Sequence, residues 1–124
     1  MNRKRPKHLA LHQIRLPLAG YVSILHRISG ALLFLALPLL LWMLYASLRS
    51  IETYTALTTI FLHPLAKLGM LLVLWAFLHH FCAGIRYLAI DLRLASSLAR
   101  ARASSVWVMI VSLALTLLIG VKLW

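Results

Sequence analysis

Three long stretches without charged residues dominate the hydrophobic pattern of this chain. They are 21, 18 and 19 residues long and cover residues 28–48, 68–85 and 103–121. About 20 consecutive apolar residues are enough for a helix to cross the hydrocarbon core of a membrane. The pattern therefore predicts an all-α integral membrane protein with three transmembrane helices, at about 21–49, 64–92 and 103–123.

The composition agrees with this interpretation, since 63% of the 124 residues are hydrophobic and only 12% are charged. We expect a single transmembrane domain, residues 1–124, in which a basic segment, residues 1–20, precedes the first helix. The connections between helices are too short to hold a catalytic domain. The single cysteine, Cys82, excludes a disulfide, an iron–sulfur cluster or a structural zinc site formed within this chain. The chain alone is therefore not expected to be an enzyme.

Basic residues give the chain a net charge of +11, and their positions indicate how it lies in the membrane. The segment before the first helix carries Arg3, Lys4, Arg5, Lys7 and Arg15. Four more lie at or beyond the end of the second stretch, namely Arg86, Arg93, Arg100 and Arg102. The positive-inside rule then places the N-terminus and the second connection in the cytoplasm or mitochondrial matrix. Anionic lipids attract such charges, so no nucleic-acid partner is predicted.

The segment SILHRISG, which begins at Ser23, places polar groups near the start of the first transmembrane helix. At 100° per residue, these groups fall within roughly 60° of one direction: Ser23, His26, Arg27 and Gly30. A charged side chain near the membrane boundary can simply extend to water, which is one interpretation of Arg27. A hydroxyl and an imidazole on the same face favour the other interpretation, a site for a polar ligand.

Two adjacent histidines, His79 and His80, lie inside the second predicted helix. A stripe of mostly small residues falls within about 40° of the direction of His80: Gly69, Val73, Ala76, Gly84, Tyr87 and Asp91. Small residues let a haem plane or another helix approach, and imidazole is the usual axial ligand of haem iron. A membrane histidine that only bonds a neighbouring helix is the alternative. His79 points about 100° away, so the stripe favours His80 as a ligand.

Two segments of the chain resemble the signatures of a known family, the cytochrome b subunits that anchor succinate dehydrogenase, respiratory complex II, in the membrane. They are RPKHLALHQIRLPLAGYVSILHRISG, residues 5–30, and HHFCAGIRYLAIDL, residues 79–92. In the second segment, a histidine stands four residues before a G-I-R motif, as it does in the family. Together the two segments and the three predicted helices extend the resemblance over nearly the whole chain.

The resemblance implies a role for individual residues. His80 matches the axial ligand of haem b, and His26 matches a residue near a haem propionate. Ser23 and Arg27 match residues that line a ubiquinone site. Many relatives have histidine where this chain has Tyr87, which can donate a hydrogen bond but cannot become cationic.

The resemblance also implies a complex. It predicts a membrane anchor of succinate:ubiquinone oxidoreductase that packs with a second small hydrophobic subunit around the haem and docks an iron–sulfur subunit and a flavoprotein. The short basic N-terminus shows no organelle transit peptide, which favours a bacterial inner membrane, with the N-terminus cytoplasmic. Two alternatives remain open from the sequence: an anchor of quinol:fumarate reductase, and a haem-free membrane scaffold.

Overall fold

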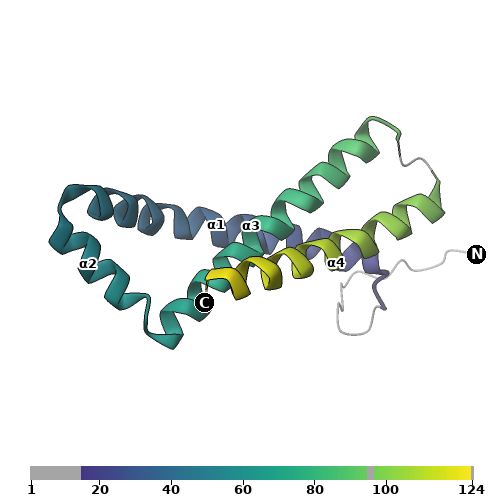
Figure 1. The fold of residues 1–124 in the computed structure, drawn as a ribbon. Coiled ribbons are helices and arrows are strands. Elements are labelled where there is room, and N and C mark those ends of the chain that lie inside the picture. The colour runs from purple at the N-terminus through teal and green to yellow at the C-terminus, as the bar shows by residue number, and fades with distance from the viewer. Residues whose placement is uncertain (1–14, 95–96, 124) are drawn as a thin grey trace, which may run out of the picture.

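The computed structural model describes residues 15–94 and 97–123, which contain four helices (Figure 1). They are α1 (Leu18–Arg49), α2 (Ile51–Ile60), α3 (Pro64–Asp91) and α4 (Leu98–Leu123). Of these, α1, α3 and α4 are long and apolar enough to cross a membrane, which confirms the predicted fold class. α1 and α4 begin earlier than the expected 21 and 103. Residues 1–14, most of the predicted basic segment, lie outside the described residues.

The connection between the first two membrane helices contains α2, a helix that the sequence analysis did not predict. Only Ser50 separates α1 from α2. Its hydroxyl accepts a hydrogen bond from the Thr53 backbone N–H at 3.3 Å, and the Thr53 hydroxyl accepts one from the Ser50 N–H at 3.2 Å. The Thr53 hydroxyl also donates to the Ala46 carbonyl in α1 at 2.6 Å. These bonds give hydrogen-bond partners to backbone groups at the start of α2 and fix the change of direction between α1 and α2.

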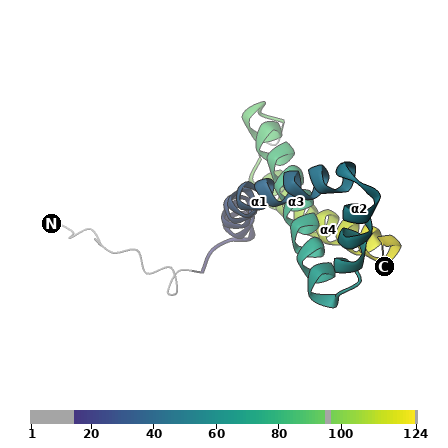
Figure 2. The ribbon, with the colours of Figure 1, turned by 90° about the vertical axis from the view of Figure 1, so that its left-hand side faces the viewer.

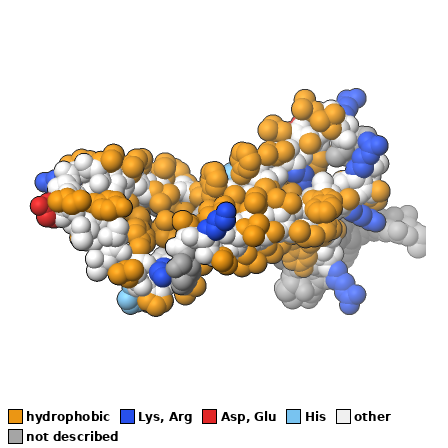
Figure 3. Space-filling view, in the orientation of Figure 1, with side chains coloured by type: hydrophobic (Ala, Val, Ile, Leu, Met, Phe, Trp, Pro, Cys, Tyr) orange, Lys and Arg blue, Asp and Glu red, His pale blue; other side chains and the backbone are white. Residues whose placement is uncertain are grey.

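α3 is the central helix of the fold, and it packs against both α1 and α4 (Figures 1 and 2). The three membrane helices meet in a small apolar core made by Val22, Ala83 and Val108. α2 lies at one end of the molecule, and the start of α1 and the α3–α4 connection lie at the other (Figure 1). Apolar side chains cover most of the visible surface between these ends (Figure 3). Such a surface is suited to lipid or to other membrane helices.

The face of α4 that packs inward is made of small and mostly polar residues. Its buried members are Ser105, Val108, Ser112, Thr116 and Gly120. The Ser105 hydroxyl donates to the Ala101 carbonyl at 2.9 Å, and the Thr116 hydroxyl donates to the Ser112 carbonyl at 2.7 Å, both within α4. These hydroxyls thus find their hydrogen-bond partners within their own helix. The packing therefore depends on the small size of the side chains, which lets α4 approach its neighbours closely.

Replacement of Ser105 is expected to reveal this dependence on size. Ser105→Leu should destabilise the assembled complex by about 1–3 kcal/mol, because a larger side chain has no room at a fully buried position. Ser105→Ala should change the stability little. Thermal unfolding of the purified complex in detergent measures both, and Val106→Leu, at an exposed position of the same helix, is the matched control. An equal loss for Ser105→Ala and Ser105→Leu would show that the hydroxyl itself is needed.

Candidate functional site

The imidazole of His80 lies half-buried between α3 and α1, where α1 holds its orientation. Its Nδ1 is 3.0 Å from the backbone carbonyl oxygen of His26 and 3.4 Å from the Ser29 hydroxyl. The rings of His26 and His80 are stacked, with centroids 4.2 Å apart and planes 14° apart. A carbonyl oxygen only accepts hydrogen bonds, so Nδ1 of His80 carries the proton. In the neutral ring, the lone pair that can bind a metal is therefore on Nε2.

This arrangement fits an axial ligand of haem. A metal-binding histidine almost always donates its second ring N–H to a carboxylate, a backbone carbonyl or water, which fixes the tautomer and raises the basicity of the ligating nitrogen. The His26 carbonyl supplies that acceptor to His80. The His80 side chain is half-buried within this chain, so part of it remains accessible to a group outside the three membrane helices.

His79, the neighbour of His80, has a different environment. Its side chain is fully buried and faces α4. Its Nδ1 lies 3.5 Å from the Ser112 hydroxyl, which itself donates to the Met109 carbonyl at 3.2 Å. Its ring stacks on that of Trp75, with centroids 5.3 Å apart. A side chain enclosed by its own chain cannot reach a haem outside it, so His79 is a packing residue of the α3–α4 interface.

The stripe of small residues on α3 faces α1. His26 of α1 lies beside it, with its ring centroid 5.3 Å from that of Tyr87. A Cβ atom added to Gly84 would lie 3.9 Å from Nε2 of His26. The two interpretations of the stripe, a haem or another helix, are therefore not exclusive: α1 fills part of the space beside the stripe and still leaves the His80 ring half-exposed.

The remaining predicted residues, Ser23 and Arg27, lie on either side of His26 in α1. Arg27 is exposed and Ser23 is half-buried. Neither side chain forms a hydrogen bond or an ion pair with any part of the chain that the structure describes. The hydrogen-bonding groups of both side chains are thus available to a ligand or a partner subunit. Ser29 was missed by the sequence analysis: it is fully buried and donates to the His26 carbonyl at 3.0 Å.

Arg86, of the G-I-R motif, connects α3 to α4 through two hydrogen bonds. Its side chain is only 7% exposed, its Nε donates to the Ser104 hydroxyl at 3.1 Å, and its Nη2 donates to the Ala101 carbonyl at 3.3 Å. Asp91 is exposed at the end of α3 and forms no ion pair with residues 15–94 or 97–123. Asp91 is therefore a solvated charge at a helix end.

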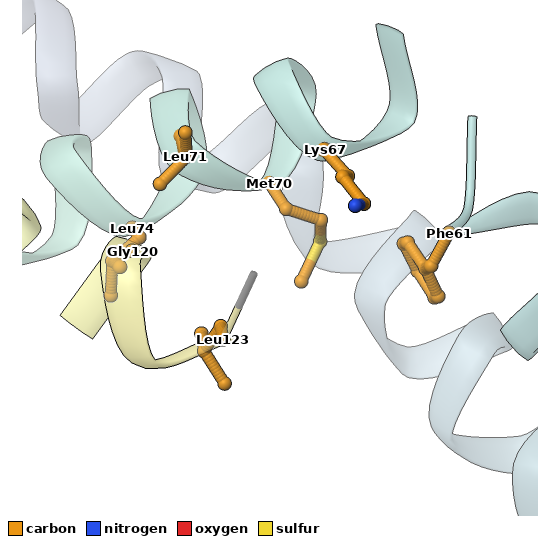
Figure 4. A pocket seen from close by; sticks show the side chains of 7 residues that line it. All are labelled: Phe61, Lys67, Met70, Leu71, Leu74, Gly120 and Leu123. Carbon is orange, nitrogen blue, oxygen red and sulfur yellow. The ribbon is translucent and has the colours of Figure 1, made fainter. Parts of the chain in front are cut away.

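An apolar pocket lies away from these residues, toward the α2 end of the molecule (Figure 4). It is lined by Phe61, Lys67, Met70, Leu71, Leu74, Gly120 and Leu123. None of the predicted site residues contributes to it. The candidate site is therefore the face where α1 meets α3, around His26, Arg27 and His80.

Comparison with known proteins relates this arrangement to one family. The family described as "Succinate dehydrogenase/Fumarate reductase transmembrane subunit" matches residues 1–119. The chain is 40% identical to the succinate dehydrogenase cytochrome b556 subunit of Coxiella burnetii, and the alignment covers 100% of both chains. It is 30% identical to the protein of that name from Rickettsia felis, over 95% of this chain and 92% of the relative. It is 31% identical to the protein of that name from Paracoccus denitrificans, over 84% of this chain and 78% of the relative.

Proposed function

The chain belongs to the family of succinate dehydrogenase/fumarate reductase transmembrane subunits, and we propose that it anchors succinate dehydrogenase in the membrane, binds haem b through His80 and helps to form the ubiquinone site. The observation that carries the proposal is the hydrogen bond from Nδ1 of His80 to the His26 carbonyl, which leaves Nε2 free to ligate. The name cytochrome b556 in the relatives supports haem b as the cofactor. When bound, haem b supplies a one-electron redox centre.

We propose that a second subunit completes the haem site, because no other histidine within residues 15–94 and 97–123 is suited to supply the second ligand. His79 is enclosed by its own chain, and His26 is stacked on His80 at 4.2 Å, which leaves no room for an iron between the two rings. His63 lies at the N-terminal end of α3, more than four helical turns from His80. We therefore assign the second axial ligand to a partner, a small hydrophobic subunit that packs against the exposed side of His80. We propose that the His26 imidazole donates a hydrogen bond to a haem propionate.

The ubiquinone role rests on Ser23 and Arg27. A quinone carbonyl gains electron density on reduction, so a hydroxyl and a guanidinium beside it stabilise the reduced forms. Both side chains are free of partners among the described residues, and Arg27 is exposed. Arg27 directly follows His26 in α1, and Ser23 lies about one turn before it, which brings the quinone site close to the haem site along α1.

Docking of an iron–sulfur subunit and a flavoprotein is proposed for the end of the molecule that carries the start of α1 and the α3–α4 connection. Lys and Arg side chains gather at this end in Figure 3, whereas Glu52, one of the two acidic residues of the chain, lies in α2. The positive-inside rule then places the docking end in the cytoplasm of a bacterium whose inner membrane holds the complex. Basic groups there also attract anionic lipids.

Purification of the complex from its native membrane tests the proposal. We expect a flavoprotein, an iron–sulfur protein and a second small hydrophobic subunit to co-purify, together with a b-type absorption spectrum on reduction. A complex with these subunits but no b-type absorption would favour the haem-free scaffold. The ratio of succinate oxidation to fumarate reduction in the same preparation separates a succinate dehydrogenase from a quinol:fumarate reductase.

A further inference from the structure

Gly30 of α1 lies directly beside the ring of His80. A Cβ atom built on Gly30 would lie 2.8 Å from Cε1 of His80, 3.2 Å from Nδ1 and 3.8 Å from Nε2. All three nearest atoms belong to one imidazole, so the edge of the His80 ring points at the backbone of Gly30. A separation below 3.0 Å is a steric overlap, and either the ring or a helix would have to move.

The His80 ring has little freedom to move. Its Nδ1 is bonded to the His26 carbonyl at 3.0 Å, and one face of the ring is stacked on His26 at 4.2 Å. Ser29, which is fully buried, contacts the same nitrogen at 3.4 Å. Displacing the ring away from α1 would break the bond that fixes its tautomer and would change the direction of Nε2. A flexible side chain could give way at lower cost, but a planar ring with these contacts cannot.

We propose that Gly30 is a positioning residue for the haem ligand: the space left by its missing side chain holds the edge of the His80 ring against α1. The inference rests on the proposed role of His80 as ligand. Together with the His26 carbonyl and Ser29, Gly30 makes α1 a support that holds the ring from its Nδ1 and Cε1 side. Nε2, the nitrogen that would bind the iron, then points away from the hydrogen bond between Nδ1 and the His26 carbonyl.

Gly30→Ala is the direct test. Alanine is a better helix former than glycine, so helix propensity alone would leave the complex as stable or more so. If Gly30 positions the ligand ring, however, Gly30→Ala should lower the haem absorbance per assembled complex. The haem that remains should show a shifted reduced absorption maximum and shifted electron paramagnetic resonance g-values. Gly69→Ala is the matched control, because a Cβ atom there meets nothing within 4 Å. A Gly30→Ala complex with the wild-type spectrum overturns the proposal.

A double-mutant cycle with His80→Ala keeps the test decisive even if Gly30→Ala impairs assembly. If Gly30 serves only to accommodate the ring, Gly30→Ala should reduce the yield and melting temperature of the complex when His80 is present, and should have no further effect in the His80→Ala background. An equal loss in both backgrounds overturns the proposal. Failure of the ligand assignment is recognised separately, since His80→Ala alone would then keep the wild-type haem spectrum.

Discussion

Replacing His80 by alanine is expected to remove or strongly alter the b-type absorption of the complex while the flavoprotein and iron–sulfur subunits still attach. The iron loses an axial ligand, whereas the docking end of the molecule, at the start of α1 and the α3–α4 connection, is unchanged. The measurement is haem absorbance relative to flavin in the purified complex. Retained succinate oxidation with a soluble dye shows that the catalytic subunits are present.

His79→Ala provides the contrast to His80→Ala, one residue away on the same helix. We expect its haem spectrum to stay close to that of the wild type, because the His79 ring is enclosed between α3 and α4. The complex should instead lose stability by about 2–4 kcal/mol, since removal of a fully buried ring leaves a cavity between the helices. If His79→Ala bleaches the haem and His80→Ala does not, the ligand assignment is wrong.

Replacing Arg27 by leucine is expected to lower succinate:quinone activity roughly 10- to 150-fold, while dye-linked succinate oxidation is retained. A hydrogen bond to a charged donor contributes about 1.5–3 kcal/mol, and each 1.4 kcal/mol corresponds to about a tenfold change in rate. Ser23→Ala removes a neutral hydroxyl and should have a smaller effect in the same assay. Both activities are compared on equal amounts of assembled complex, measured by flavin content.

The alternative role of Arg27, contact with lipid headgroups, gives a different pattern of results. Arg27→Lys would then be silent, and Arg27→Leu would affect insertion without a selective loss of quinone reduction. For a quinone-binding guanidinium, Arg27→Lys should be clearly impaired, because lysine cannot reproduce the planar set of donors. Equal losses in the quinone and dye assays, or no loss in either, would exclude the quinone role.

The three membrane helices and the different directions of the His79 and His80 side chains could be predicted from the sequence. Uncharged stretches of about 20 residues have few alternatives in a protein, and adjacent helical residues point about 100° apart regardless of tertiary context. The structure places the two rings accordingly, His79 against α4 and His80 against α1. These conclusions depend only on helix geometry and the cost of charge in lipid.

The supports of the site could not be predicted, because they depend on how the helices pack. Nothing in the sequence indicates that the Gly30 backbone meets the His80 ring, or that Arg86 turns toward Ser104 and the Ala101 carbonyl. α2 was missed for a local reason. Its threonines suggested a loop, but several of their hydroxyls donate to carbonyls of the preceding turn, as Thr55 does to Ile51 at 2.8 Å.

The short connection through α2 bears on how the protein is made. His26 and His80 are 54 residues apart in the chain, and only residues 50–63 separate α1 from α3. As a ribosome delivers the chain to the membrane, α1 and α3 therefore emerge as a hairpin, and both halves of the imidazole pair are present before α4 has been synthesised. The newly made subunit can thus acquire the orientation of its His80 ring early, before it meets any other subunit.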